Sequence, residues 1–451
     1  MRIDLIVAEI GSTTTVVNAF TGLKNGRPRF LGQGMAATSI VEGDVTIGLR
    51  RAENNLAVTL GVSSLEADSI LATSSAAGGL SMTVHGLVPD MTVNAAREAA
   101  LGSGAVLRMV SSGKLRPHDL ERVRDVKPRI IMVAGGVDGG ERETALFNFE
   151  RLTEVLPGTP ILYAGNTDNI GEIRKIASQS GVKLYVTDNV YPSLDCLNVE
   201  PARQVIQTIF EEHIIEAPGM ARILETVTGR IMPTPGAVMA MTEKMYDILG
   251  DLVTLDVGGA TTDVHSVTQG SEALRDFQLN PEPFAKRTVE GDLGVFVNRE
   301  HVIKAMTPQE QAQLPEGYAD ALLSVPEIPE DDEQAKLIRP MVGTCCREAL
   351  SRHAGRMVEL FTARGRRTVV RGRDLTAVQT IIATGGALTK LSGMSNVIRE
   401  QLQTVGTERL YPPENVRVMI DRDYLMASCG VMVKAFPEAA VQLLSESLMQ
   451  I

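Results

Sequence analysis

Residues 5–14 read LIVAEIGSTT, and residues 252–261 read LVTLDVGGAT. Each copy is an apolar segment that ends in an acid, followed by one aliphatic residue, a glycine, and then small and hydroxyl residues. The two acids, Glu9 and Asp256, are separated by more than half of the chain, which is far too long a period for a solenoid repeat. The sequence therefore predicts one domain core that occurs twice.

In both copies the polar turn leads into a second strand, at residues 16–20 and 263–268, so each copy predicts a β-hairpin and not a strand-to-helix unit. Between the copies, residues 128–188 alternate short apolar strands with helical segments. That rhythm indicates a parallel sheet with helical crossovers. We therefore expect an α/β protein. Residues 315–336, with three prolines and a run of acids, are predicted to form an exposed loop or linker.

The composition narrows the class of protein. The chain has 451 residues, which predicts two or three domains, and a net charge of -11, which argues against an electrostatic binder of nucleic acid. No apolar run approaches the length of a membrane span, and the four cysteines show no metal-binding spacing. We expect a reduced, soluble, cytoplasmic protein. One basic cluster is either a solvated turn or a docking patch for an acidic partner; it comprises Arg364, Arg366, Arg367, Arg371 and Arg373.

The two turns have the chemistry of phosphate sites. A glycine and hydroxyl turn between strands presents backbone N–H groups without bulky side chains, and such a concavity suits phosphate oxygens. Carboxylates beside phosphates require a hard cation, so Glu9 and Asp256 are predicted to hold Mg²⁺ and to act in catalysis. Asp263 supports a threonine of the turn or is satisfied by solvent. The predicted phosphate-binding residues are Gly11, Ser12, Thr13 and Thr14 in the first turn, and Gly258, Gly259, Ala260, Thr261, Thr262 and Asp263 in the second.

These motifs resemble those of the actin, hexokinase and sugar-kinase ATPase superfamily. Residues 9–14 and 255–263 are similar to its two phosphate motifs, and residues 382–388 (IATGGAL) to its adenosine motif, which would place adenosine at Gly385, Gly386 and Ala387. The resemblance implies two ribonuclease-H-like domains with ATP between them and hinged closure. The expected domains are residues 1–250, with an insertion at about 39–230, and residues 251–451.

Within the superfamily, the chain resembles the MutL (GlmL) accessory proteins through residues 72–80, 86–92, 133–140 and 162–166. The resemblance implies an ATP-binding chaperone or reactivating factor for an adenosylcobalamin-dependent mutase of the glutamate mutase or aminomutase type. The expected partners are ATP or ADP and the mutase subunits, with a homodimer left open. A small-molecule kinase and a non-catalytic nucleotide-binding scaffold are the alternatives.

One position departs from the superfamily, which has aspartate where this chain has Glu9. The extra methylene moves the carboxylate outward by about one bond length, which disturbs water-mediated Mg²⁺ geometry. We therefore expect nucleotide binding with, at most, slow ATP hydrolysis. Asp138 and Glu141 are candidates for positioning the attacking water. The alternative is that they belong to a glycine-rich turn and to the first turn of a helix.

Overall fold

The computed structural model describes residues 1–40, 42–75, 80–214, 219–229, 231–362, 365–403 and 408–450. Residues 76–79, part of the stretch that resembles the MutL proteins, and Arg364 of the basic cluster lie outside the described residues. The chain divides into two compact units, the first formed by Met1–Ala77, Ile214–Leu279 and Arg287–Ile451, and the second by Gly78–His213 and Asn280–Lys286. Within the described ranges, no helix has the length and apolar character needed to cross a bilayer.

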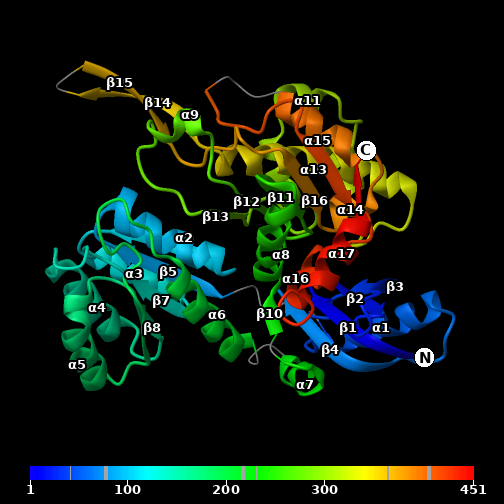
Figure 1. Cartoon of the computed structure of the whole chain (residues 1–451), viewed down its shortest axis with the longest axis horizontal. Helices are drawn as coiled ribbons and strands as arrows, with labels where there is room; N and C mark the ends of the chain where they lie inside the picture. Colours follow the sequence, from blue (N-terminus) through cyan, green and yellow to red (C-terminus); the bar gives the residue numbers. More distant parts are fainter. Residues whose placement is uncertain are drawn as a thin grey trace. The chain divides into compact units, whose positions relative to one another are not determined.

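The first unit contains two sheets that share one strand order (Figure 1). In the first sheet the order is β3-β2-β1-β4-β10, and in the second it is β13-β12-β11-β16-β17, followed by a sixth strand, β18. The strands of the first sheet are β1 (Arg2–Ile10), β2 (Thr14–Thr21), β3 (Arg29–Ala37), β4 (Glu66–Ser74) and β10 (Ile231–Pro233). Those of the second are β11 (Leu252–Val257), β12 (Thr262–Val267), β13 (Ala285–Glu290), β16 (Thr380–Thr384), β17 (Arg417–Asp421) and β18 (Leu448–Gln450).

The predicted repeat forms the centre of both sheets. Strands β1 and β11 each pair antiparallel with the strand that follows the polar turn, β2 or β12. On the other side each pairs with a parallel strand, β4 or β16. The duplicated α/β core is therefore confirmed, with the two ribonuclease-H-like sheets that the superfamily resemblance implies.

Central strands covered on both faces have near-continuous apolar sequences, and β1 and β11 fit that pattern because nearly all of their residues are buried. The helices of the first unit are α1 (Val45–Thr59), α7 (Met220–Thr226), α8 (Thr234–Leu249), α9 (Glu272–Arg275), α10 (Arg299–Ala305), α11 (Pro308–Ala312), α12 (Tyr318–Leu323), α13 (Asp332–His353), α14 (Gly386–Lys390), α15 (Met394–Gln403), α16 (Met426–Met432) and α17 (Pro437–Ser447). Helices α8 and α16 touch at Gly430, where an added Cβ would lie 1.9 Å from the carbonyl oxygen of Ala237.

The second unit is a doubly wound parallel sheet with the order β6-β5-β7-β8-β9. All of its strand pairs are parallel, as the strand and helix rhythm of residues 128–188 predicts. Its strands are β5 (Ser81–Gly86), β6 (Val106–Ser112), β7 (Ile130–Val133), β8 (Ile161–Tyr163) and β9 (Leu184–Val186). Its helices are η1 (Pro89–Val93), α2 (Asn94–Gly102), α3 (Pro117–Val126), α4 (Glu143–Val155), η2 (Thr167–Asn169), α5 (Ile170–Ser180) and α6 (Glu200–Ile214).

Two segments differ from the sequence expectation in their local structure. The predicted insertion at about 39–230 includes α1 and β4, which belong to the first unit. The predicted linker at 315–336 contains α12 and the start of α13, and its residues Tyr318, Leu322 and Val325 are buried in the core of the second sheet. The prolines that suggested a linker separate short helices. The boundary expected near residue 250 stays a prediction.

Candidate functional site

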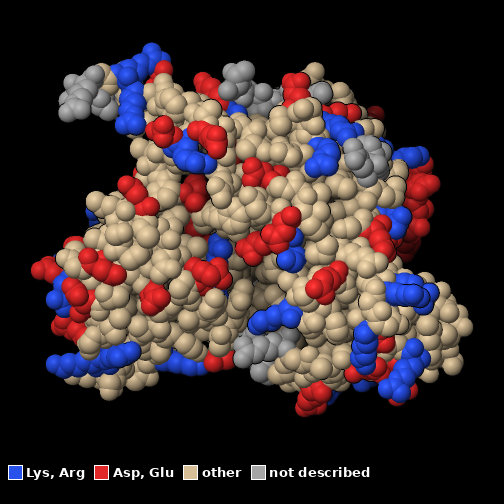
Figure 2. All heavy atoms as spheres, in the orientation of Figure 1, with Lys and Arg blue, Asp and Glu red and all other residues tan. Residues whose placement is uncertain are grey.

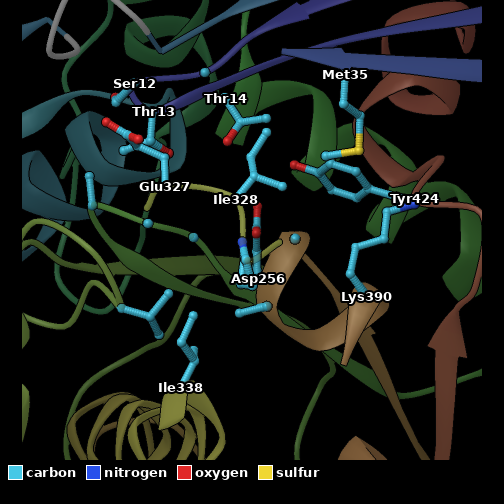
Figure 3. A pocket seen from close by; sticks show the side chains of 18 of the residues that line it. Ser12, Thr13, Thr14, Met35, Asp256, Glu327, Ile328, Ile338, Lys390 and Tyr424 are labelled. Carbon is cyan, nitrogen blue, oxygen red and sulfur yellow. The ribbon is translucent and has the colours of Figure 1, made fainter. Parts of the chain in front are cut away.

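The first unit contains a cavity of about 370 Å³ lined by both polar turns (Figure 3). The floor is formed where β1 and β11 end, and Figure 3 shows the Asp256 side chain pointing into the cavity. The predicted site residues that line it are Glu9, Gly11, Ser12, Thr13, Thr14, Asp256, Gly258, Gly259, Ala260, Thr261, Asp263, Gly386 and Ala387. The structure thus brings together residues from three separate sequence motifs.

The two turns are closed by the same backbone hydrogen bond. The amide of Gly11 donates to the carbonyl of Thr14 at 3.0 Å, and the amide of Gly258 donates to the carbonyl of Thr261 at 2.9 Å. A Cβ at Gly11 would lie 2.5 Å from the Thr14 carbonyl oxygen, so this tight turn leaves no room for a side chain. The sequence repeat is therefore also a structural repeat, down to the hydrogen bond that closes each turn.

The turns also meet one another. A Cβ added at Gly259 would lie 2.7 Å from Oγ1 and 3.0 Å from Cγ2 of Thr13. In the part of the chain that the structure describes, the backbone N–H groups of Ser12, Thr13, Gly259 and Ala260 donate no hydrogen bond to a protein acceptor. Unpaired amides beside a cavity form a concavity suited to an anion, and here two turns contribute to one cavity.

Glu9 ends β1 as a buried acid, with only 4% of its surface exposed. Its Oε1 accepts a hydrogen bond from the hydroxyl of Tyr424 at 2.9 Å, whereas its Oε2 is buried without a partner among the described residues. Burial raises the pKa of the Glu9 carboxyl to about 7; the Tyr424 hydrogen bond opposes that rise, and the nearby charge of Asp421 adds to it. An orphaned buried carboxylate oxygen is costly unless something else occupies that side of the cavity.

Asp256 occupies the equivalent position at the end of β11. Burial raises its pKa well above the usual value, and the neighbouring carboxylates of Asp263 and Glu9 raise it further. A Cβ at Gly385 would lie 2.4 Å from Asp256 Oδ1, so the glycine allows the β16 turn to approach this carboxylate. Gly385 has a φ of +88°, in the left-handed region that favours glycine.

Asp263 on β12 is held by a buried ion pair. Its Oδ1 accepts from Nε of Arg287 at 2.8 Å and from the same guanidinium's Nη2 at 2.5 Å, and its Oδ2 accepts from the Thr261 hydroxyl at 3.2 Å. Asp263 therefore supports Thr261 from behind the turn and is not a solvent-satisfied acid. Thr262 is turned elsewhere, because its buried hydroxyl donates to the carbonyl of Leu293.

The donor set suits a hydrated divalent cation. Two carboxylates with raised pKa values, Glu9 buried with one unpaired oxygen and Asp256 half-buried, gain from a positive charge placed between them. Mg²⁺ keeps several waters and needs only one or two protein carboxylates. No group of three or more His, Cys, Asp or Glu side chains is arranged as a ready metal centre within the described ranges. Glu9 and Asp256 are thus the side chains that would hold such an ion, through its waters.

Comparison with known proteins places the chain in a family. A family profile described as "MutL protein" matches residues 5–448. A curated relative, "Protein MutL" of Clostridium tetanomorphum, is 33% identical over 466 residues, covering 99% of each chain. The chain belongs to the MutL family. The family resemblance stated from residues 72–166 is therefore confirmed.

Solved structures give looser likenesses to this MutL-family chain. A nucleotide-free acetone carboxylase superposes with a TM-score of 0.41 at 13% identity, covering 95% of this chain and 70% of the other. A nucleotide-free diol dehydratase-reactivating factor superposes with a TM-score of 0.35 at 13% identity, covering 96% and 100%. Likenesses this distant say nothing about what the chain binds.

The remaining predicted residues, Asp138 and Glu141, lie in the second unit and have local structural partners there. Asp138 Oδ1 accepts from the amide of Thr167 and from the Asn189 side chain, each at 2.9 Å. Glu141 Oε1 accepts from the amide and the hydroxyl of Thr144, near the start of α4. Asp138 lies in the glycine-rich turn, as the structural alternative states, whereas Glu141 lies two residues before α4 begins and not in its first turn. The catalytic role of both residues stays a prediction.

Several cavity residues have no signal in the sequence. Tyr424 follows β17 in a left-handed conformation, with a φ of 56°, and reaches Glu9. Lys390 of α14 donates to Gln33 Oε1 at 2.9 Å, and burial lowers the pKa of its amine. Figure 3 shows Lys390 and Tyr424 together on one side of the cavity. Residues 327–332, from the predicted linker, line it as well. Among these residues, Tyr424 is unusual for its left-handed backbone and residues 327–332 for their prolines and acids. Neither feature indicates a ligand.

Proposed function

We propose that this MutL-family chain is an ATP-binding accessory protein that acts as a chaperone or reactivating factor for an adenosylcobalamin-dependent mutase. The observation that carries the nucleotide part is the meeting of two turns closed by the same hydrogen bond, whose unpaired amides line one cavity beside the carboxylates of Glu9 and Asp256. An anion alone would be repelled by Glu9 and Asp256, whereas a polyphosphate with a bound divalent cation satisfies both groups.

In this proposal the amides of Ser12, Thr13, Gly259 and Ala260 bind phosphate oxygens. Glu9 and Asp256 hold Mg²⁺ through its waters, and the ion neutralises the charge of the phosphates. The residues Gly385, Gly386 and Ala387, at the end of β16, accommodate the adenosine.

The proposed accessory role depends on coupling between nucleotide binding and the arrangement of the two sheets. The cavity is lined by elements of both sheets, so a ligand held by both turns stabilises whichever arrangement of the sheets lets it contact both. Such a ligand changes affinity for a partner protein when that partner prefers one arrangement. Membership of the MutL family supports a partner of the glutamate mutase or aminomutase type.

The nucleotide part is tested by thermal unfolding with and without Mg-ATP. We expect Mg-ATP to raise the melting temperature of the native chain, because it binds only the folded state. Gly259→Ala should reduce this shift, since the new methyl group displaces the Thr13 side chain where the turns converge. Gly291→Ala is the matched control, because its methyl group would enter open space. No shift for the native chain would refute nucleotide binding.

The partner is tested separately by co-purification with an adenosylcobalamin-dependent glutamate mutase. We expect a complex whose yield changes when ATP replaces ADP. Failure to form any complex with either nucleotide, despite a normal thermal shift, would refute the accessory role and leave the nucleotide site intact.

A further inference from the structure

The first unit also contains a separate two-stranded ribbon, which projects from its surface (Figure 1). It consists of β14 (Arg356–Thr362) and β15 (Gly365–Arg371), paired antiparallel along their length. Residues 365–368 are all exposed, whereas Val369 and Val370 at the base are buried. At its base both outer edges are hydrogen-bonded, through Met357 to Glu408 on one side and through Val370 to Phe277 and Leu279 on the other. Beyond the base the ribbon is exposed, and an exposed strand edge offers backbone groups and side chains to a partner.

The charge of the ribbon is opposite to that of the chain. Residues 356–373 contain six arginines and one acid, Glu359, in a protein with a net charge of -11. Arg366 pairs with Glu359 across the ribbon, and Arg367 is exposed with no partner among the described residues. Figure 2 shows this basic group on the projecting part of the surface. The ribbon is therefore a basic arm on an acidic body.

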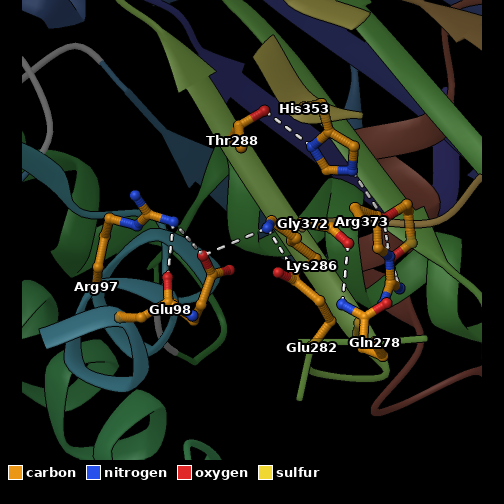
Figure 4. Close-up of polar contacts among 12 residues, drawn as sticks. Arg97, Glu98, Gln278, Glu282, Lys286, Thr288, His353, Gly372 and Arg373 are labelled. Carbon is orange, nitrogen blue, oxygen red and sulfur yellow. Dashed lines mark hydrogen bonds and ion pairs between the residues drawn. The ribbon is translucent and has the colours of Figure 1, made fainter. Parts of the chain in front are cut away.

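The base of the arm is fixed by buried polar contacts (Figure 4). Arg373, only 4% exposed, donates from Nε to the Ser266 hydroxyl at 3.0 Å, and His353 Nε2 lies 2.8 Å from the same oxygen. Gln278 donates to the Gly372 carbonyl at 3.1 Å. The two chain segments cross so closely that a Cβ at Gly355 would lie 2.6 Å from the backbone of Gly372. A rigid base presents the exposed arginines at a fixed position.

The arginines of the sequence cluster therefore divide by role. Arg373 anchors the arm, whereas Arg366 and Arg367 are presented to solvent. Guanidinium groups pair well with carboxylates because their fork matches carboxylate geometry. We propose that this arm docks onto an acidic surface of the enzyme that the chain serves, which rests on the accessory role proposed above. A nucleic acid fits less well, because its continuous negative charge would also face the acidic body.

The arm's contribution should show as electrostatic attraction. Charged contacts at the rim of an interface mainly determine the association rate and its dependence on salt. Added salt should therefore weaken the complex with the mutase, because exposed charges are screened beyond about 8 Å at physiological ionic strength. Nucleotide binding should not depend on the arm, since none of its residues lines the cavity.

The test compares two variants with equal changes of charge. Arg366→Glu/Arg367→Glu reverses the exposed charges of the arm, and Arg50→Glu/Lys434→Glu reverses two exposed charges elsewhere. Binding of each to the same glutamate mutase is measured with Mg-ATP at low and high salt. We expect the arm variant to bind at least about tenfold more weakly at low salt and to lose its salt dependence, with the control within about twofold of the native chain. Arg366→Gln/Arg367→Gln removes the same two charges without reversing them, so it separates a loss of attraction from a ribbon disturbed by charge reversal.

The outcomes separate the arm from the accessory role. A native chain that binds the mutase, with an arm variant that binds equally well, overturns the docking arm alone. A native chain that binds no mutase overturns both. A mixed-sequence DNA duplex serves as a further probe: arm-dependent binding to it, with unchanged binding to the mutase, would assign the arm to nucleic acid and overturn the proposal. The thermal shift with Mg-ATP, unchanged in every variant, shows that each one is folded.

Discussion

Tyr424 donates its phenolic hydrogen to Glu9 Oε1 at 2.9 Å, joining two residues that are 415 positions apart. The hydrogen bond links the end of the central strand of one sheet to the loop after β17 of the other. That loop is tightly fixed, because Asp421 accepts from the amides of Leu425 and Met426. The longer side chain that distinguishes Glu9 from the superfamily's aspartate is thus the one that reaches Tyr424.

Removing this hydroxyl should weaken nucleotide binding near neutral pH. In Tyr424→Phe the Glu9 carboxylate loses its donor, so its pKa rises further and less of it is ionised at pH 7. We expect several-fold weaker Mg-ATP binding at pH 7 and recovery at pH 8.5, measured by calorimetry. Tyr185→Phe is the matched control, since it removes a tyrosine–glutamate hydrogen bond from the second unit. Equal effects of the two substitutions would contradict the role of Tyr424.

The raised pKa of Glu9 predicts a pH-dependent stability of the nucleotide-free chain. A carboxyl with a pKa of about 7 when folded, against 4.5 ordinarily, binds its proton more tightly in the native state. Its stabilising effect is complete below pH 4.5 and is lost as the pH rises through 7, a change of up to about 3 kcal/mol. Glu9→Gln removes this loss. Urea unfolding at pH 5 and pH 8 should therefore show that the free energy of unfolding falls with pH more steeply for the native chain than for Glu9→Gln. Equal falls in the two proteins would refute the raised pKa of Glu9.

Shortening the same side chain should increase ATP hydrolysis. Glu9→Asp withdraws the carboxylate from Tyr424 and gives this position the aspartate of the superfamily that the motifs resemble, which suits the hydrated metal ion of the proposed site. We expect faster phosphate release than from the native chain, with Glu9→Gln slower than both. A rate for Glu9→Asp at or below the native value would contradict the geometric explanation of this position.

The contact between α8 and α16 predicts opposite effects at two helical glycines. Gly430→Ala would place a methyl group 1.9 Å from the Ala237 carbonyl oxygen, which forces the helices apart and should cost about 1–3 kcal/mol. Gly236→Ala on α8 meets its nearest atom at 3.8 Å, so it should be neutral or stabilising by up to about 1 kcal/mol. Denaturant unfolding measures both. Similar losses in the two variants would show that close packing at Gly430 is not the cause.

The sequence was sufficient for the parts of the molecule that depend on local patterns. The repeated turn at residues 11–14 and 258–261 has the predicted hairpin form, because glycine and hydroxyl residues at fixed spacing determine its hydrogen bonds locally. The parallel strands of residues 128–188 likewise follow from alternating apolar and helical segments.

Contacts between distant segments could not be predicted in this way. Tyr424 carries no pattern that names Glu9 as its partner, and the pairing of Asp263 with Arg287 depends on how β12 meets the strand beside it. The acidic run at 327–332 has the composition of a linker, yet the buried side chains before it fix that segment beside the cavity. In each case tertiary packing decides the role of a residue whose local sequence is ordinary.

The central claim is that the two turns and the two carboxylates bind a nucleotide with a divalent cation. Calorimetric titration of the native chain with ATP, first with Mg²⁺ and then with excess EDTA, tests it most directly. Saturable binding at one site per chain that is lost in EDTA, and weakened in Gly259→Ala while retained in Gly291→Ala, is the predicted result. Absence of binding with Mg²⁺, or binding of equal strength in EDTA and in the Gly259→Ala variant, would contradict the claim.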